Sequence, residues 1–209
     1  LTLDMSAAGA ATFNSDLTTG GKLTVSDGGN TTVAAIRFNA GLGISAPSTD
    51  QMNFITADIS RLVIAADGSL STPTLGTSNV RLGVNAGNSI ISGGNYNTVV
   101  GDEAGTAITT GDDNTFVGYA AGDALDEGKG NVAIGMNCLG GDTFGCRNIA
   151  IGHAALITQN FTTETNAFNI AIGYSTGAAI TTGVQNTLIG GEAGDALIDA
   201  DFNVAVGRN

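Results

Sequence analysis

The chain of 209 residues has no Trp, two Pro and two Cys, and charged residues make up only 12% of it. A disordered segment would need high charge and few β-branched residues, which this chain does not have. The scarcity of Pro, with Gly in no period of three, excludes a collagen triple helix. No apolar run approaches the roughly 18 residues of a membrane span, so membrane insertion is not expected.

Acidic residues outnumber basic ones by 19 to 7, which gives a net charge of −12. A nucleic-acid partner is therefore excluded, because phosphate binding needs clustered Lys and Arg. No signal peptide is visible. The chain opens at Leu1 in what reads as the middle of a strand, so we expect a fragment of a longer protein.

What the chain does contain is Gly, with 32 residues, and small or β-branched apolar residues within a hydrophobic share of 42%. This mixture predicts short strands joined by tight turns, an all-β fold. From residue 79 onward the order Asn, three mostly apolar residues, Gly recurs with spacings of 18, 17, 17, 17, 21, 17 and 17 residues. The eight units begin at Asn79, Asn97, Asn114, Asn131, Asn148, Asn169, Asn186 and Asn203. The long interval predicts a four-residue insertion within 158–168.

A second anchor lies seven and eight residues after the Asn, where Ala-Gly occurs in four units, as at Ala121-Gly122, and variants such as Cys138-Leu139 occur in three. An aliphatic residue follows at the eleventh position in most units, as at Leu125. A period of 17 residues is too short for a helical repeat or a propeller blade and fits one coil of a β-solenoid.

Alternation along the strand predicts that the first and third residues after the Asn share one face. Because they are mostly Val, Ile, Leu or Thr, we expect them to fill the solenoid core. The residues predicted for this core are Val132, Ile134, Ile149, Ile151, Ile170 and Ile172. The middle residue, often Ala, should then point outward, and an apolar outward row implies packing against a neighbouring chain.

The Gly that ends each strand is expected at a corner, either with positive φ or with close backbone approach. The corner glycines are Gly101, Gly118, Gly135, Gly152, Gly173, Gly190 and Gly207. The Asn that opens each strand should stack on the next Asn or cap the turn.

Residues 1–76 lack this period and read as a separate β-rich module, joined to a repeat domain at 77–209. Strand-like alternation occurs at 22–26, 32–38, 51–56 and 61–65, with turns at 27–30 and 67–68. Pro73 lies in the expected linker.

The units Asn131-Val-Ala-Ile-Gly135 and Asn148-Ile-Ala-Ile-Gly152 resemble the head repeats of trimeric autotransporter adhesins of the YadA type. That resemblance implies a trimeric β-roll with the Val and Ile inside. The spacing from Asn to Ala is one residue shorter here, and the coil is longer.

The chain as a whole resembles a phage tail fibre. Residues 3–13 are similar to the "LDxSGNATF" opening of fibre shafts, and residues 52–68 to the "tNGteRmrIdsdGnvgIGt" segment. The resemblance implies a homotrimeric, rod-like virion protein that contacts other tail proteins, is assembled in the host cytoplasm and acts outside the cell. A host cell-surface receptor is a further candidate partner.

Chemistry-bearing motifs are scarce. His153, which follows a repeat Gly, is the one candidate for a histidine base, and no nucleophile or phosphate-loop motif accompanies it. Adjacent acids occur at 102–103, 112–113 and 126–127, and Asp123 and Asp195 share a repeat position several coils apart. Cys138 and Cys146 are either one local disulfide or two buried thiols. We therefore expect no catalytic residues, no cofactor and no metal site.

The favoured function is a structural segment of a trimeric tail fibre used in host attachment, which projects a distal receptor-binding part. A bacterial adhesin head that itself binds host molecules is the first alternative. A tailspike polysaccharide depolymerase is the second, and it would need two carboxylates about 5–10 Å apart across a groove.

Overall fold

The computed structural model describes residues 35–39, 42–45, 52–56, 59–64, 70–71 and 76–208. All regular elements in these ranges are β-strands, which form one antiparallel sheet and one long parallel sheet with a small two-stranded companion. The all-β fold with a 17-residue solenoid is therefore confirmed.

The antiparallel sheet has the strand order β1-β2-β3-β4-β5. Its strands are β1 (Ala35–Asn39), β2 (Leu42–Ser45), β3 (Met52–Thr56), β4 (Ile59–Ile64) and β5 (Leu70–Ser71). The strands expected within 32–38, 51–56 and 61–65 correspond to β1, β3 and β4, whereas β2 was not anticipated. The strand expected at 22–26 and the turns at 27–30 and 67–68 lie outside the described residues, as does Pro73.

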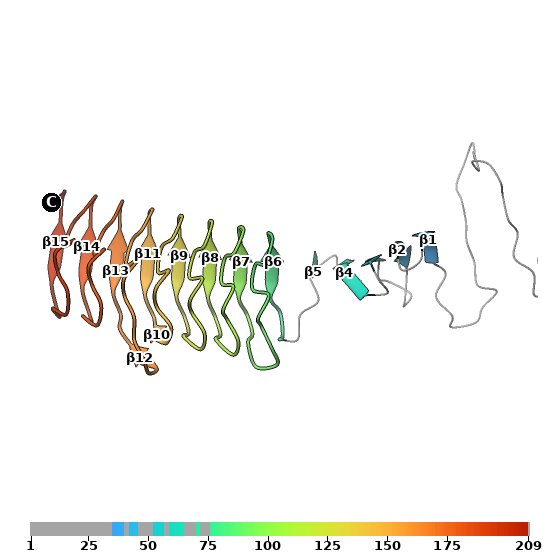
Figure 1. Ribbon diagram of the computed structural model, residues 1–209, viewed down its shortest axis with the longest axis horizontal. Coiled ribbons are helices and arrows are strands. Elements are labelled where there is room, and N and C mark those ends of the chain that lie inside the picture. The colour runs from blue at the N-terminus through green and yellow to red at the C-terminus, as the bar shows by residue number, and fades with distance from the viewer. Residues whose placement is uncertain are drawn as a thin grey trace, which may run out of the picture.

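The parallel sheet contains one three-residue strand from each repeat, stacked in sequence order (Figure 1). These strands are β6 (Val80–Leu82), β7 (Thr98–Val100), β8 (Thr115–Val117), β9 (Val132–Ile134), β11 (Ile149–Ile151), β13 (Ile170–Ile172), β14 (Thr187–Ile189) and β15 (Val204–Val206). Neighbouring strands pair in register, so each repeat position forms a column, as in Ala133, Ala150 and Ala171.

The repeat Asn residues form a continuous ladder inside the solenoid. The Asn114 backbone N–H and side-chain Nδ2 donate to Asn97 Oδ1 at 3.0 and 3.1 Å, and Nδ2 also donates to the Gly128 carbonyl at 2.9 Å. Asn131 makes the same bonds one coil later, to Asn114 and Gly145. The stacking role expected for these residues is confirmed, and the ladder satisfies amides that would be costly to bury alone.

The Asn ladder reverses the inside and outside faces that the sequence analysis assigned. With the Asn side chain pointing inward, strand alternation sends the middle residue inward and the first and third residues outward. Ala133, Ala150 and Ala171 are fully buried. The prediction that the larger aliphatic residues form the core is therefore wrong, because these side chains lie on the outer face and are partly exposed: Val132, Ile134, Ile149, Ile151, Ile170 and Ile172.

The interior is narrow, and in several coils the middle strand residue and the residue six positions later compensate for one another in size. Where the middle residue is Phe116, the position six residues later is Gly122, whose Cβ would lie only 2.6 Å from the Phe116 ring. Where the middle residue is Ala133, the equivalent position holds the buried Leu139. A large side chain at one of the two positions is thus paired with a small one at the other, which keeps the core filled.

All seven predicted corner glycines have φ between 129° and 141°. At Gly135 an added Cβ would lie 2.6 Å from the carbonyl oxygen of Gly152, the corner of the next coil. Both reasons proposed for a corner Gly, positive φ and close backbone approach, therefore hold at this position.

The insertion is confined to about residues 161–164. Hydrogen bonds with 17-residue spacing continue as far as the pair Thr143 and Asn160. The next ladder contacts, between β10 (Gly145–Cys146) and β12 (Thr165–Asn166), have a 20-residue spacing. The extra residues form a bulge beside the solenoid, near the labels β10 and β12 in Figure 1.

Candidate functional site

The outer face of the parallel sheet is the most distinctive surface of the solenoid. It consists of the first and third strand residues of every coil, none of which is charged: Val80, Leu82, Thr98, Val100, Thr115, Val117, Val132, Ile134, Ile149, Ile151, Ile170, Ile172, Thr187, Ile189, Val204 and Val206. The acidic residues within 76–208 all lie at other repeat positions. Charge is thus kept off this one face.

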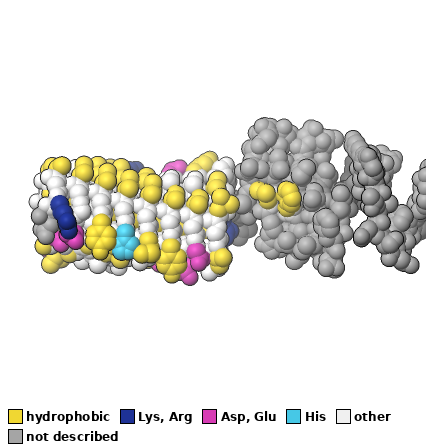
Figure 2. Space-filling model, turned by 90° about the horizontal axis from the view of Figure 1, so that it is seen from above, with side chains coloured by type: hydrophobic (Ala, Val, Ile, Leu, Met, Phe, Trp, Pro, Cys, Tyr) yellow, Lys and Arg dark blue, Asp and Glu magenta, His cyan; other side chains and the backbone are white. Residues whose placement is uncertain are grey.

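Two further rows border the outer face. The leading margin is the residue before each Asn: Ser78, Tyr96, Asp113, Gly130, Arg147, Phe168, Gln185 and Phe202. The trailing margin is the residue after each corner Gly: Val84, Asp102, Tyr119, Met136, His153, Tyr174, Gly191 and Arg208. Figure 2 shows rows of hydrophobic side chains running along the solenoid, with a histidine in one of them.

Hydrophobic exposure is concentrated on this side. Within residues 76–208, every large hydrophobic side chain that is exposed lies on the outer face or a margin, apart from Ile91 and Ile198. The aromatic ones sit in the margins, with Phe168 50% and Tyr174 57% exposed. This side of the solenoid is therefore the candidate interaction surface.

The margins are held rigidly. Every leading-margin residue has a positive φ, as at Phe168 with 52°. This conformation is unusual for a residue with a side chain, and Gly130 is the only glycine in the row. Backbone ladders join successive rows, for example from Arg147 N–H to the Lys129 carbonyl at 2.9 Å and from Ser175 N–H to the His153 carbonyl at 2.9 Å. The surface is therefore preorganised, which lowers the entropy lost on binding.

His153 lies in the trailing margin, just after the corner Gly152, as the sequence indicated. Its ring stacks on Tyr174 in the next coil, with ring centres 5.4 Å apart and planes within 8°. The Nδ1 atom is buried and has no hydrogen-bond partner within the described part of the chain.

The two cysteines form no disulfide, so the alternative of two buried thiols is correct. Burial raises the pKa of Cys138 to about 12, and its Sγ donates to the Gly135 carbonyl at 3.0 Å. Burial also raises the pKa of Cys146, whose Sγ accepts the Lys129 N–H at 3.3 Å. Thiols held in the neutral form are poor nucleophiles and poor metal ligands.

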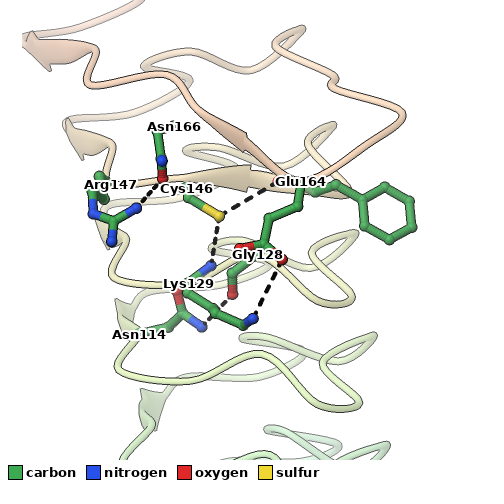
Figure 3. Close-up of polar contacts among 8 residues, drawn as sticks. Asn114, Gly128, Lys129, Cys146, Arg147, Glu164 and Asn166 are labelled. Carbon is green, nitrogen blue, oxygen red and sulfur yellow. Dashed lines mark hydrogen bonds and ion pairs between the residues drawn. The ribbon is translucent and has the colours of Figure 1, made fainter.

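The bulge is anchored by charged and polar contacts, several of which appear in Figure 3. Lys129 Nζ pairs with Glu164 at 3.4 Å, and Arg147 donates to Asn166 and lies over the Phe168 ring. These contacts connect the bulge and the residues that follow it to the two preceding coils.

A buried carboxylate holds the start of the bulge. Asp142 accepts the N–H groups of Gly145 and Phe161, both at 3.1 Å, and the Gln159 Nε2 at 2.6 Å. Desolvation raises its pKa despite these three donors. Asp142 and Gln159 occupy the eleventh position, where most coils carry an aliphatic residue, so the core is locally polar at the bulge.

The acidic residues singled out from the sequence lie outside the strands and mainly brace turns. Asp112 Oδ1 accepts the Asn95 N–H at 2.7 Å, and Asp126 accepts the Thr109 hydroxyl. The pKa of Asp123 is raised by burial and further by the charge of Glu103. Across the described ranges, no three His, Cys, Asp or Glu side chains gather closely enough to hold a metal ion.

The same ranges contain no helix long and apolar enough to cross a membrane. Comparison with protein families, with curated proteins and with solved structures finds no match to this chain. The margins are a candidate feature that the repeat pattern did not predict, although the residues beside each Asn and corner Gly include several aromatic ones.

Proposed function

We propose that this chain is a structural segment of a homotrimeric fibre, similar to a phage tail fibre, which holds a distal receptor-binding part away from the virion. The observation that carries the proposal is the outer face, a row of uncharged aliphatic strands with no partner in a single chain. Parallel sheets normally have both faces covered. Here the interior covers one face, and the second face calls for other chains.

The pattern of charge supports the same arrangement. Apart from Asp102 and Asp113, which lie in the margins, the acidic residues of 76–208 occupy other repeat positions, where most of them keep a long assembly soluble and separate from other rods. A stripe with such continuous aliphatic character would promote aggregation if it stayed in water. A closed trimer buries all three stripes around one axis and leaves the acidic sides outside.

The size of the surface requires the margins to take part in the contact. Eight strands about 4.8 Å apart extend roughly 34 Å, and a strip about 10 Å wide covers on the order of 350 Å². Including both margins about doubles that area, and the trimer divides it between two neighbouring chains, so each pairwise contact has on the order of 350 Å² per partner, below the roughly 800 Å² of a standard interface, even with the margins included. The margins therefore belong to the proposed interface.

Paired substitutions on two sides of the solenoid test the assembly. Replacing Ile134 and Ile172 by Lys places charge on the outer face, where a monomer tolerates it because both sites reach solvent. The matched control replaces Ser92 and Thr182, which are exposed on the far side, by Lys. Light scattering after size exclusion should show a folded monomer for the first variant and a trimer for the control. Trimers from both would contradict the proposed interface.

Electron microscopy with antibodies raised against this chain tests the biological setting. The proposal expects labelling of tail fibres between their base and their tip. Labelling of a bacterial cell surface instead would support the adhesin alternative and overturn the fibre assignment.

A further inference from the structure

The two margins are the part of the surface whose partner can be worked out in most detail, given the proposed trimer. They lie on opposite sides of the outer face, one before each strand and one after it. If the outer face turns toward a threefold axis, the leading margin of one chain must face the trailing margin of the next. The contact joins unlike surfaces, so each chain uses both margins.

Closed threefold symmetry also determines which residues meet. Chains related by rotation alone have the same coil at the same height along the axis. The two margin residues of one coil are six positions apart within a 17-residue rise of about 4.8 Å, so they differ in height by less than about 2 Å. Each leading residue therefore faces the trailing residue of the same coil in the neighbouring chain.

We infer that the trimer is held in register by same-coil contacts between these margins, with Phe168 of one chain packed against Tyr174 of the next. Both rings are about half exposed in the single chain. Arg147 lies over one of them and His153 stacks on the other, so each ring is already oriented. Aromatic pairs of this kind contribute beyond the area that they bury.

The charged margin residues favour the same register. In same-coil contacts Asp102 faces Tyr96 and Asp113 faces Tyr119, so each carboxylate meets a phenol that can donate a hydrogen bond. A shift of one coil would instead bring Asp102 against Asp113. Like charges facing each other in an interface are strongly unfavourable. The acidic residues thus discriminate against the shifted assembly.

Disulfide trapping in the full chain tests this register. A variant with Phe168→Cys and Tyr174→Cys should, on oxidation, close a covalent ring of three chains that runs as a trimer on a denaturing, non-reducing gel. The control variant carries Phe168→Cys and Tyr119→Cys, three coils apart. That distance is about 14 Å, well beyond the Cα separation of roughly 7 Å that a disulfide can bridge. The native cysteines are buried and are common to both variants.

Sedimentation of each variant before oxidation tests the trimer separately from its register. A trimer that becomes covalent only in the same-coil variant supports the register. A trimer that becomes covalent in the control, or in neither variant, overturns the register while leaving the proposed trimer in place. A monomer in sedimentation overturns the trimer and the register together.

Discussion

Replacing Gly135 by Ala is the sharpest test of how the coils are packed. The Gly135 backbone has φ of 133°, a conformation that residues with a side chain rarely adopt. The added Cβ would lie 2.6 Å from the carbonyl oxygen of Gly152 and 2.7 Å from its carbonyl carbon. Both atoms belong to the backbone of the next coil, so no side-chain rotation can relieve the contact.

The size of the effect follows from two contributions. Holding Ala in this conformation costs about 1–3 kcal/mol. Forcing an extra methyl group into a packed site adds about 1–3 kcal/mol. We therefore expect Gly135→Ala to lower the free energy of unfolding by about 2–6 kcal/mol, a large part of the stability of an ordinary domain.

Two other glycines separate these contributions. Gly207 has the same conformation, with φ of 134°, but an added Cβ would meet nothing within 4 Å. Gly207→Ala should therefore show only the conformational cost. Gly191 lacks a positive φ, and its Cβ would also meet nothing within 4 Å. Gly191→Ala should be neutral or stabilising by up to about 1 kcal/mol.

Urea unfolding followed by far-UV circular dichroism suits a chain without Trp. All variants are compared at one protein concentration, because assembly contributes to apparent stability. The expected order of destabilisation is Gly135→Ala, then Gly207→Ala, then Gly191→Ala. If Gly135→Ala proves as mild as Gly191→Ala, the close approach of successive corners is refuted.

Three further predictions use the same unfolding assay. Asn114→Ala should cost about 2–4 kcal/mol, because it leaves ladder partners in both adjacent coils unsatisfied, and a loss below 1 kcal/mol would contradict a buried ladder. Ala133→Phe and Leu139→Gly should each destabilise strongly alone but much less together, since the double variant recreates the Phe116 arrangement, whereas additive losses would contradict size compensation. Burial raises the pKa of Asp142 in the fold above its ordinary value of 3.8, so the folded state binds this proton more tightly than the unfolded state does. The resulting stabilisation is fully present below pH 3.8 and is lost as the pH rises through the folded pKa. Acidification from pH 7 should therefore stabilise the wild type more than Asp142→Asn, and equal pH dependence would contradict the raised pKa.

The period, the strand positions and the corners could all be predicted from sequence, because they depend on local features. An Asn and a Gly at constant spacing recur in every coil, and each has a conformational or hydrogen-bonding role that needs no knowledge of distant residues. The insertion could be predicted for the same reason, since it changes a spacing.

The inside and outside faces could not be assigned from hydrophobicity. Val132 and Ile134 are larger and more apolar than Ala133, yet the buried Asn131 side chain sets the alternation and turns Ala133 inward. In a narrow solenoid a small residue on the strand leaves interior space that another segment can fill, and Leu139 fills the space beside Ala133. The apolar outward row inferred from the sequence does exist, but it consists of the larger residues.

The bulge shows a second limit. The sequence indicates extra residues there, but the spacing does not reveal that Asp142 and Gln159 replace aliphatic core positions to hold them. A buried carboxylate with backbone donors from two segments is a tertiary arrangement, and it becomes recognisable only when 17-residue columns are placed in space.

Sedimentation equilibrium of the full chain at micromolar concentration tests the central claim most directly. The chain mass is 20.7 kDa, so a trimer would have a mass of about 62 kDa. The outer face and margins predict that single trimeric species, with no change on dilution across the micromolar range. A monomer at the chain mass would show that the uncharged aliphatic face is stable in water on its own, and would contradict the proposed fibre segment.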